Sequence, residues 1–322
     1  MSFRSLLTFI GLTLILTGCA TQTTMKPQAP EPEGSGLSLV DNHVHALAFD
    51  RMNADRLYLA THEGLLVLTP EGHLSQVSTE QHDFMGFSIH PFDPQRMFGS
   101  GHPESGGNLG FIQSSDGGRS WQKIADVTTD GPVDFHAMTV SQTNPNLLFG
   151  WEDRHIYRSE DGGVSWSIAS RSPVNVLSLA TDSEDDRILY IGTNAGLLKS
   201  ADRGETWEHV NLVDEVPIFG LFSNRDGTLT LATSWDGLLQ INLHDPDSRI
   251  TRLSPLPDKL VAKTVTVDPG DSTIIIAAAE DHVFRSDDGG MSWQNFLPTG
   301  KAPQSNPEIC SAGSNAGCGE VE

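Results

Sequence analysis

The chain repeats one order of apolar and polar stretches six times. A repeat opens on an apolar run such as residues 44–49, passes through a turn rich in Asp, Asn or Pro, and continues into two further apolar runs, at 56–60 and 64–67 in the first repeat. Short apolar runs bounded by such residues predict β-strands. Few segments show helical spacing, so the pattern predicts an all-β fold.

A short motif, S-x-D-x-G-x-[ST]-W, follows the third predicted strand in four of the repeats. It occupies residues 114–121, 159–166, 200–207 and 286–293. Its carboxylate can accept backbone N–H groups within the turn, and its glycine can adopt a positive φ. The tryptophan then opens a fourth strand and buries a large ring. The motif predicts structural roles for its aspartates, which are Asp116, Asp161, Asp202 and Asp288.

The spacing of these aspartates gives the length of the repeat. Successive intervals are 45, 41 and 86 residues, and the last is twice 43, so one repeat has lost its motif. Counting 45 residues back from Asp116 leads to Glu71, in a degenerate turn. Repeats of this length with four short strands are typical of propeller blades. We therefore expect a six-bladed β-propeller over residues 37–299, with seven blades as the alternative count.

The motif resembles the BNR/Asp-box repeat of sialidases, sortilin-type receptors, some xyloglucan hydrolases and photosystem II assembly factors. The resemblance covers nearly all of residues 37–299 and implies a propeller with the motif on its outer rim. It does not fix an activity, because one fold serves many functions. A sialidase would place an arginine triad and a tyrosine on its central face. Tyr58, Tyr157 and Tyr190 lie instead on second or third strands, which disfavours sialidase chemistry.

The N-terminus reads as a targeting segment. Arg4 precedes an apolar run at 6–16, too short to cross a bilayer comfortably, and Leu16-Thr17-Gly18-Cys19 resembles the bacterial lipobox. The resemblance implies a signal peptide at 1–18, cleavage, and a lipid on Cys19 that anchors the protein in the cell envelope. In a Gram-negative cell it implies the outer membrane, facing the periplasm. An uncleaved signal anchor is the alternative.

Both flanks of the predicted propeller have the composition of flexible segments. Residues 19–36 are rich in Pro, Thr and Gln, as in a tether, and 300–322 form a Gly- and Ser-rich tail. Cys310 and Cys318 in that tail can pair in an exported chain, or remain idle thiols. The formal net charge of −22 argues against a nucleic-acid partner and against docking on anionic lipid through a basic face.

Chemically useful side chains gather where one central face of the propeller is expected. The start of each first strand and the turn between the second and third strands should meet at this face. Blades one to three place several histidines, acids and a methionine there, whereas blades four to six place few such side chains there. The first-strand residues are His43, His45, Asp83, Met85, Asp134 and His136, and the turns and the loop at 101–110 add His62, His102, Glu104, Trp151 and Trp235.

Imidazole, carboxylate and thioether groups are metal-ligand types, and methionine favours copper. We therefore expect a copper or zinc site drawn from His43, His45, Met85, His102, His136, Asp83 and Asp134. His62, Glu104, Trp151 and Trp235 would complete a ligand-binding face. In the alternative interpretation the histidines hydrogen-bond between blades and Met85 plugs the channel.

Three functions are consistent with this face. The leading interpretation is a cell-envelope lipoprotein that acts as a binding module rather than a catalyst. A glycoside hydrolase would use Asp83 and Asp134 as its two carboxylates, with Trp151 and Trp235 as sugar-stacking platforms. A protein-assembly scaffold would use the same face to hold an envelope partner.

Overall fold

The computed structural model describes residues 37–40, 42–172, 175–234, 237–245, 247 and 249–297. Cys19, Cys310 and Cys318 lie outside these residues, as does Trp235. The predicted signal peptide, tether and tail therefore stay predictions. Within the described part of the chain, no helix has the length and apolarity needed to span a membrane.

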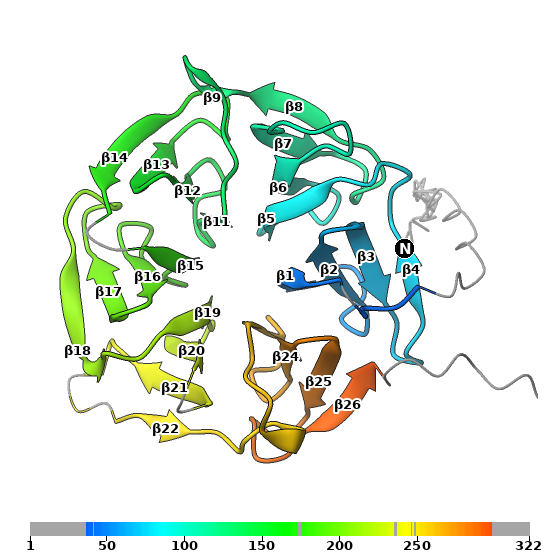
Figure 1. The fold of residues 1–322 in the computed structure, drawn as a ribbon. Helices are drawn as coiled ribbons and strands as arrows, with labels where there is room; N and C mark the ends of the chain where they lie inside the picture. Colours follow the sequence, from blue (N-terminus) through cyan, green and yellow to red (C-terminus); the bar gives the residue numbers. More distant parts are fainter. Residues whose placement is uncertain are drawn as a thin grey trace, which may run out of the picture. The chain divides into compact units, whose positions relative to one another are not determined.

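Six four-stranded antiparallel sheets surround a central axis, which confirms the all-β, six-bladed propeller and excludes the seven-bladed count (Figure 1). Each blade uses four consecutive strands, with the first innermost. Blade one comprises β1 (Val44–Phe49), β2 (Leu57–Thr61), β3 (Gly64–Leu68) and β4 (Leu74–Gln76); blade two β5 (Asp83–Ile89), β6 (Met97–His102), β7 (Phe111–Ser114) and β8 (Gln122–Ala125); blade three β11 (Ala137–Val140), β12 (Leu148–Glu152), β13 (His155–Ser159) and β14 (Ser167–Arg171). Blade four comprises β15 (Val176–Thr181), β16 (Leu189–Thr193), β17 (Gly196–Ser200) and β18 (Glu208–Asp214); blade five β19 (Ile218–Ser223), β20 (Thr228–Thr233), β21 (Leu238–Asn242) and β22 (Thr251–Arg252); blade six β23 (Thr264–Val267), β24 (Ile275–Ala279), β25 (His282–Ser286) and β26 (Gln294–Leu297).

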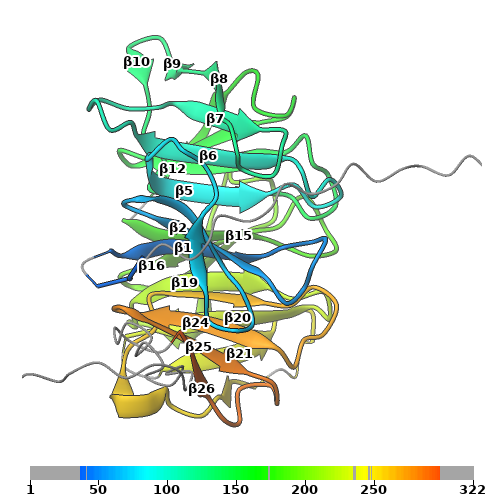
Figure 2. The same ribbon diagram turned by 90° about the vertical axis from the view of Figure 1, so that its right-hand side faces the viewer.

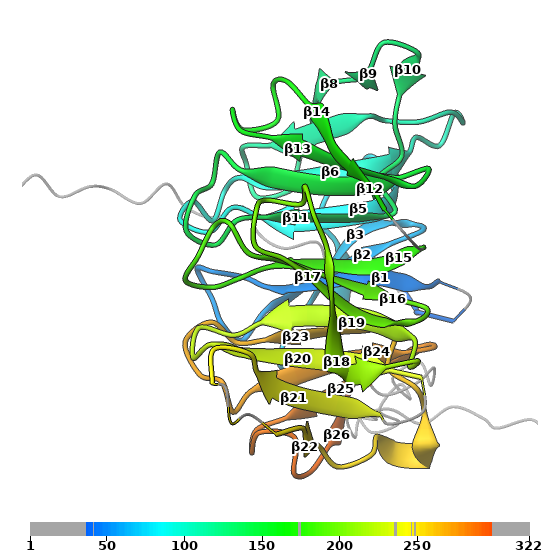
Figure 3. The ribbon, with the colours of Figure 1, turned by 90° about the vertical axis from the view of Figure 1, so that its left-hand side faces the viewer.

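Two small elements interrupt this regular order. The hairpin of β9 (Val127–Thr128) and β10 (Gly131–Pro132) precedes blade three, and a short 3-10 helix, η1 (Pro257–Lys259), precedes blade six. Both lie on the same face of the propeller, as the two edge-on views show (Figures 2 and 3). They belong to connections that enter a first strand, so this face also carries the starts of β1 and β5.

The four copies of the repeated motif form the same turn between a third and a fourth strand. In the second copy, Asp161 Oδ1 accepts the Ser159 hydroxyl at 2.8 Å and the Ser165 backbone N–H at 2.9 Å, while Oδ2 accepts the Ser165 hydroxyl at 2.5 Å. Those bonds from Ser165 hold the pKa of the Asp161 carboxyl below its usual range. Gly162 and Gly163 both take positive φ, at 76° and 92°. The aspartate thus organises the turn from within.

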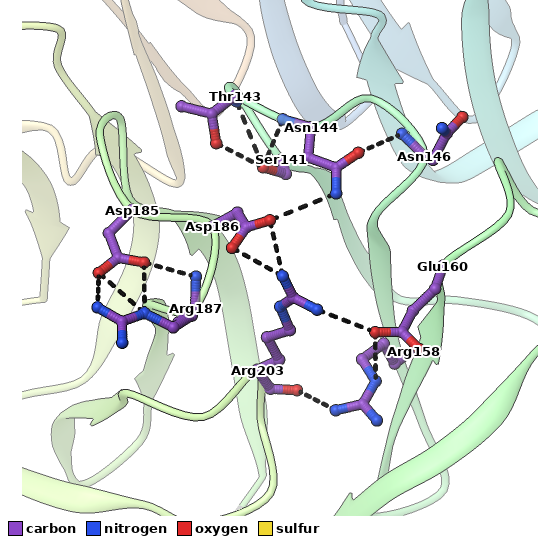
Figure 4. A network of polar contacts seen from close by, with 10 residues as sticks. All are labelled: Ser141, Thr143, Asn144, Asn146, Arg158, Glu160, Asp185, Asp186, Arg187 and Arg203. Carbon is purple, nitrogen blue, oxygen red and sulfur yellow. Dashed lines mark hydrogen bonds and ion pairs between the residues drawn. The ribbon is translucent and has the colours of Figure 1, made fainter.

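The third copy has an arginine where the others have their first glycine. Arg203 adopts a φ of 61°, a conformation that costs a non-glycine residue free energy. Its guanidinium pairs with Asp186 at 2.9 Å and with Glu160 at 3.1 Å, and Arg158 donates to the Arg203 carbonyl at 3.2 Å (Figure 4). These contacts tie the outer rims of blades three and four together and offset the backbone strain.

Apolar side chains fill the spaces between adjacent blades. The Trp121 ring lies 4.9 Å from Phe84, and Trp166 lies 5.1 Å from Phe135 of the same blade and 5.2 Å from Phe111 of blade two. The last blade packs on the first through one buried cluster that includes Leu47 and Leu297. No sheet among the described residues crosses that junction, because every sheet consists of consecutive strands.

A channel runs along the axis of the propeller. It has a volume of about 450 Å³ and is lined by all six first strands. One ring of its wall consists of Ala46, Gly86, Ala137, Ser178, Gly220 and Thr264. At Gly86 a Cβ would lie 2.6 Å from the Phe135 carbonyl oxygen, so a side chain there would force the neighbouring strand to move. Glycine at this ring therefore lets the first strands of neighbouring blades pack closely around the axis.

Candidate functional site

A recurrent β-bulge turns one residue of the first strand toward the channel. The pairing register shifts at His45 in β1, Met85 in β5, Leu177 in β15 and Phe219 in β19. All four line the channel, as does His136 just before β11. The corresponding residue of blade six, Lys263, places Nζ 4.0 Å from the centroid of the Phe219 ring. Around this ring, blades one to three therefore contribute imidazole and thioether groups, whereas blades four to six contribute apolar side chains and one ammonium group.

Blades one and two bring a first cluster together at this mouth, which we call the His45 cluster: His45, His62 and Asp83. The His45 Nε2 atom lies 3.4 Å from His62 Nδ1, and His62 Nδ1 lies 2.9 Å from Asp83 Oδ1. One ligand atom from each residue falls within 4.8 Å of the other two. His43 packs beside it, with its ring centroid 5.7 Å from that of His62. The cluster has the donor types and spacing of a metal site.

The environment keeps His45 neutral. Burial in the mouth, followed by the nearby charge of His62, lowers its pKa to about 4, although Asp83 opposes the shift. Charges on His43 and His136 act in the same direction as His62. A neutral imidazole has a free lone pair, which is the form that binds a metal.

Blades two and three supply a second cluster, the Asp134 cluster, made of Asp134, His102 and His136. Asp134 is 3% exposed, and its Oδ2 lies 3.0 Å from His102 Nε2 and 3.4 Å from His136 Nδ1. The other oxygen, Oδ1, is buried without a hydrogen-bond partner among the described residues. Burial raises the pKa of the Asp134 carboxyl, and the two imidazoles oppose the rise.

The pKa of His102 shifts in the opposite direction to the pKa of His45. Burial alone would lower its pKa, but the bond from its ring to the Gly107 carbonyl and the charge of Asp134 outweigh that effect and raise it. His102 is therefore held by the loop at 101–110 on one side and by a carboxylate on the other. Glu152 completes this region by accepting the Asp134 backbone N–H at 2.9 Å.

The remaining predicted face residues contribute less direct contacts. Met85 lines the channel in the same ring as His45. The Trp151 ring meets His136 edge-on at 6.3 Å, and its indole N–H is buried without a partner in the described part of the chain. Glu104 is exposed in the loop after β6. His62 was expected on the ligand face rather than among the metal ligands, yet it is the residue that joins His45 to Asp83.

Comparison with known proteins identifies relatives among propellers of different function. No protein-family model matches the chain. The xyloglucanase Xgh74A of Acetivibrio thermocellus is 23% identical over 225 residues, which cover 61% of this chain and 23% of that protein. A xyloglucanase of a Paenibacillus species is 26% identical over 152 residues, covering 43% of this chain and 15% of its own. The chain thus spans a quarter or less of the curated relatives it matches.

Solved structures give the same picture of the fold. The GH74 enzyme of Niastella koreensis superposes with a TM-score of 0.61 at 17% identity, covering 78% of this chain and 45% of that one. YCF48 from Cyanidioschyzon merolae superposes with a TM-score of 0.51 at 17% identity, covering 80% of this chain and 85% of that one. These likenesses establish a shared propeller fold.

Proposed function

We propose that this protein is a cell-envelope binding module whose histidine-rich mouth holds a transition-metal ion, copper or zinc. The observation that carries the proposal is the His45 cluster, in which three ligand atoms from His45, His62 and Asp83 lie within 4.8 Å of one another. Two imidazoles and one carboxylate suit zinc or copper, and three protein ligands leave a position open for a further ligand.

The surroundings favour this assignment over simple packing. His45 is neutral at physiological pH, because its pKa is about 4, so no proton has to leave it before a metal binds. Met85 lines the same ring and offers a thioether, which is a ligand for copper rather than zinc. The Asp134 cluster, on blades two and three, would serve as the polar wall of the mouth.

Metal analysis and equilibrium dialysis of the purified protein test the proposal. We expect one copper or zinc ion per chain, and at least tenfold weaker binding in His62→Gln and in Asp83→Asn. His73→Gln, on the turn between β3 and β4, is the matched control and should leave binding unchanged. A Met85→Leu variant that weakens copper but not zinc would identify copper as the metal. Metal binding that is absent, or indifferent to both cluster variants, would refute the proposal.

A protein-assembly scaffold is the second candidate, and the likeness to YCF48 favours it. The YCF48 match covers most of both chains, whereas the GH74 match covers less than half of the enzyme. A structure described as YCF48 bound to D1 peptide also superposes, with a TM-score of 0.52 at 15% identity. Cross-linking in native envelopes, followed by loss of the captured partner on Trp151→Ala, would support this role in place of metal binding.

The xyloglucanase relatives keep a glycoside hydrolase among the candidates. Asp83 and Asp134 would be its carboxylates, but each is already engaged by histidine, and Asp134 is almost fully buried. Release of reducing sugar from xyloglucan by the purified protein, abolished by Asp83→Asn and by Asp134→Asn, would establish the enzyme.

The envelope location rests on Cys19, and we propose that it carries the lipid anchor. Mass spectrometry of the mature protein should then find a lipid-modified Cys19 as the first residue. Cys19→Ala should release the protein from membranes into the soluble fraction. An unmodified N-terminus that begins upstream of Cys19 would contradict the assignment.

A further inference from the structure

The opposite mouth of the channel is built from the turns between first and second strands. Each turn begins with a buried polar residue that caps it. Asp50 Oδ1, for example, accepts the Met52 backbone N–H at 2.8 Å, and Asp182 Oδ1 accepts that of Glu184 at 2.9 Å. The residue after the cap occupies equivalent positions around the mouth: Arg51, Pro91, Gln142, Ser183, Arg225 and Pro269. Two of the six are arginines.

Arg51 and Arg225 both line the channel, and both are exposed to solvent at its mouth. Neither forms an ion pair with any residue that the structure describes, although the chain carries 42 acidic residues against 20 Lys and Arg. The surrounding protein, and then the positive charge of Arg225, lower the pKa of Arg51. A guanidinium group in a protein nevertheless stays charged at neutral pH. Two guanidinium groups that line one mouth, neither with an ion-pair partner among the described residues, favour an anion there.

The carboxylates nearest this mouth are engaged by their own turns. Asp226 Oδ1 accepts the backbone N–H of Thr228 at 3.0 Å and its hydroxyl at 2.6 Å. Asp268 Oδ1 accepts the Gly270 N–H at 2.7 Å. Each carboxylate thus uses its Oδ1 within its own loop rather than on an arginine.

Part of the wall above the arginines is suited to an apolar group. Ala48, Ala180 and Phe222 line the channel there, beside the hydroxyl groups of Ser88, Thr139 and Thr266. The channel volume of about 450 Å³ lies within the range of small-molecule sites. Inorganic phosphate has no apolar part to contact this wall, whereas the hydrocarbon part of an organic acid would pack against it. The six residues from His45 to Arg51 span about 20 Å of strand, so this mouth is remote from the His45 cluster.

We infer that the arginine mouth binds a small organic anion, with its carboxylate between Arg51 and Arg225 and its apolar body inside the channel. The site is separate from the proposed metal site and does not depend on it. A bidentate guanidinium contact would fix the carboxylate, and burial of the apolar body would supply the rest of the affinity.

Isothermal titration calorimetry with hexanoate, its uncharged analogue hexanamide, and inorganic phosphate tests the inference. We expect hexanoate to bind at least tenfold more tightly than either of the others. Arg51→Gln and Arg225→Gln should each weaken hexanoate at least tenfold, while Arg171→Gln, an exposed arginine of β14, should not. Arg51→Lys keeps the charge and guards against a folding defect, so it should retain more affinity than Arg51→Gln.

Three results would overturn the inference. Equal affinity for hexanamide would show that the charge is not recognised, and tighter binding of phosphate would show that the apolar wall is not used. Hexanoate affinity that is unchanged in both Arg51→Gln and Arg225→Gln would show that the anion binds at another site. Hexanoate affinity that is unchanged in His62→Gln would show that the site stands whether or not the metal proposal does.

Discussion

The protonation of His45 offers a direct test of how the histidine-rich mouth is built. Burial and the charge of His62 lower the pKa of His45 to about 4, and Asp83 opposes them. His62→Gln should therefore raise the pKa of His45 toward its ordinary value, and Asp83→Asn should lower it further. The two variants remove neighbours of opposite effect, so their shifts should have opposite signs.

The size of the pKa shift decides whether protons compete with a metal ion for His45. An ordinary imidazole with a pKa near 6.5 is protonated about 97% of the time at pH 5, which weakens metal binding about 30-fold. At the same pH, His45 with a pKa of about 4 is protonated about 10% of the time, and the loss is negligible. The lowered pKa also means that folding loses stability as pH falls from about 6.5 to about 4.

Two-dimensional NMR of the imidazole groups between pH 3.5 and 8 measures this titration. Among the 12 histidines of the chain, the His45 resonances can be assigned from their loss in His45→Gln. A His45 midpoint between pH 6 and 7 would refute the account of the mouth. Shifts of the same sign in His62→Gln and Asp83→Asn would show that the charges assigned to these neighbours are wrong.

Three further predictions concern the turns and the core, and urea denaturation measures each. Gly163→Ala should cost about 3 kcal/mol, because its Cβ would meet Phe111 at 2.0 Å, whereas Gly289→Ala, which has open space around it, should cost about 1 kcal/mol for its positive φ alone. Asp202→Asn should lower the free energy of unfolding by about 1 kcal/mol at pH 7. Burial raises the pKa of the Asp202 carboxyl, but four hydrogen bonds from its turn outweigh burial and hold the pKa at about 2. The stability that these bonds provide is therefore lost as pH falls from about 4 toward 2. Trp121→Ala should cost 3–5 kcal/mol, about as much as other buried aromatic truncations, and a loss below 1 kcal/mol would show that the ring is not part of the core.

The fold was predictable because its signal recurs. Four copies of one turn motif, at intervals near 43 residues, fix the blade length, and the number of strands follows from the apolar runs. A single residue that departs from the repeated motif is harder to interpret from sequence. Arg203 occupies a glycine position of the motif, and only the positions of Asp186 and Glu160 explain how that residue is tolerated.

The site was predictable to the level of one face, and less well in its detail. The alternation of the first strands indicated that His45, Met85 and His136 would share a ring. The turn between β2 and β3 contains two residues, His62 and Glu63, and which side chain points to the axis depends on the turn geometry. No periodicity in sequence reports that geometry. That Arg51 and Arg225 line the same mouth was equally hidden, because they lie 174 positions apart along the chain.

The junction between the last blade and the first differs from the other five in one respect. The chain itself crosses each of the others, but blades six and one meet only through side chains such as Leu47 and Leu297, with no shared sheet among the described residues. We expect a thermal fluctuation that opens the ring to begin at this junction. His45, His62 and Asp83 lie on blades one and two, so an opening between blades six and one would leave the three side chains on one side of the gap and preserve their spacing.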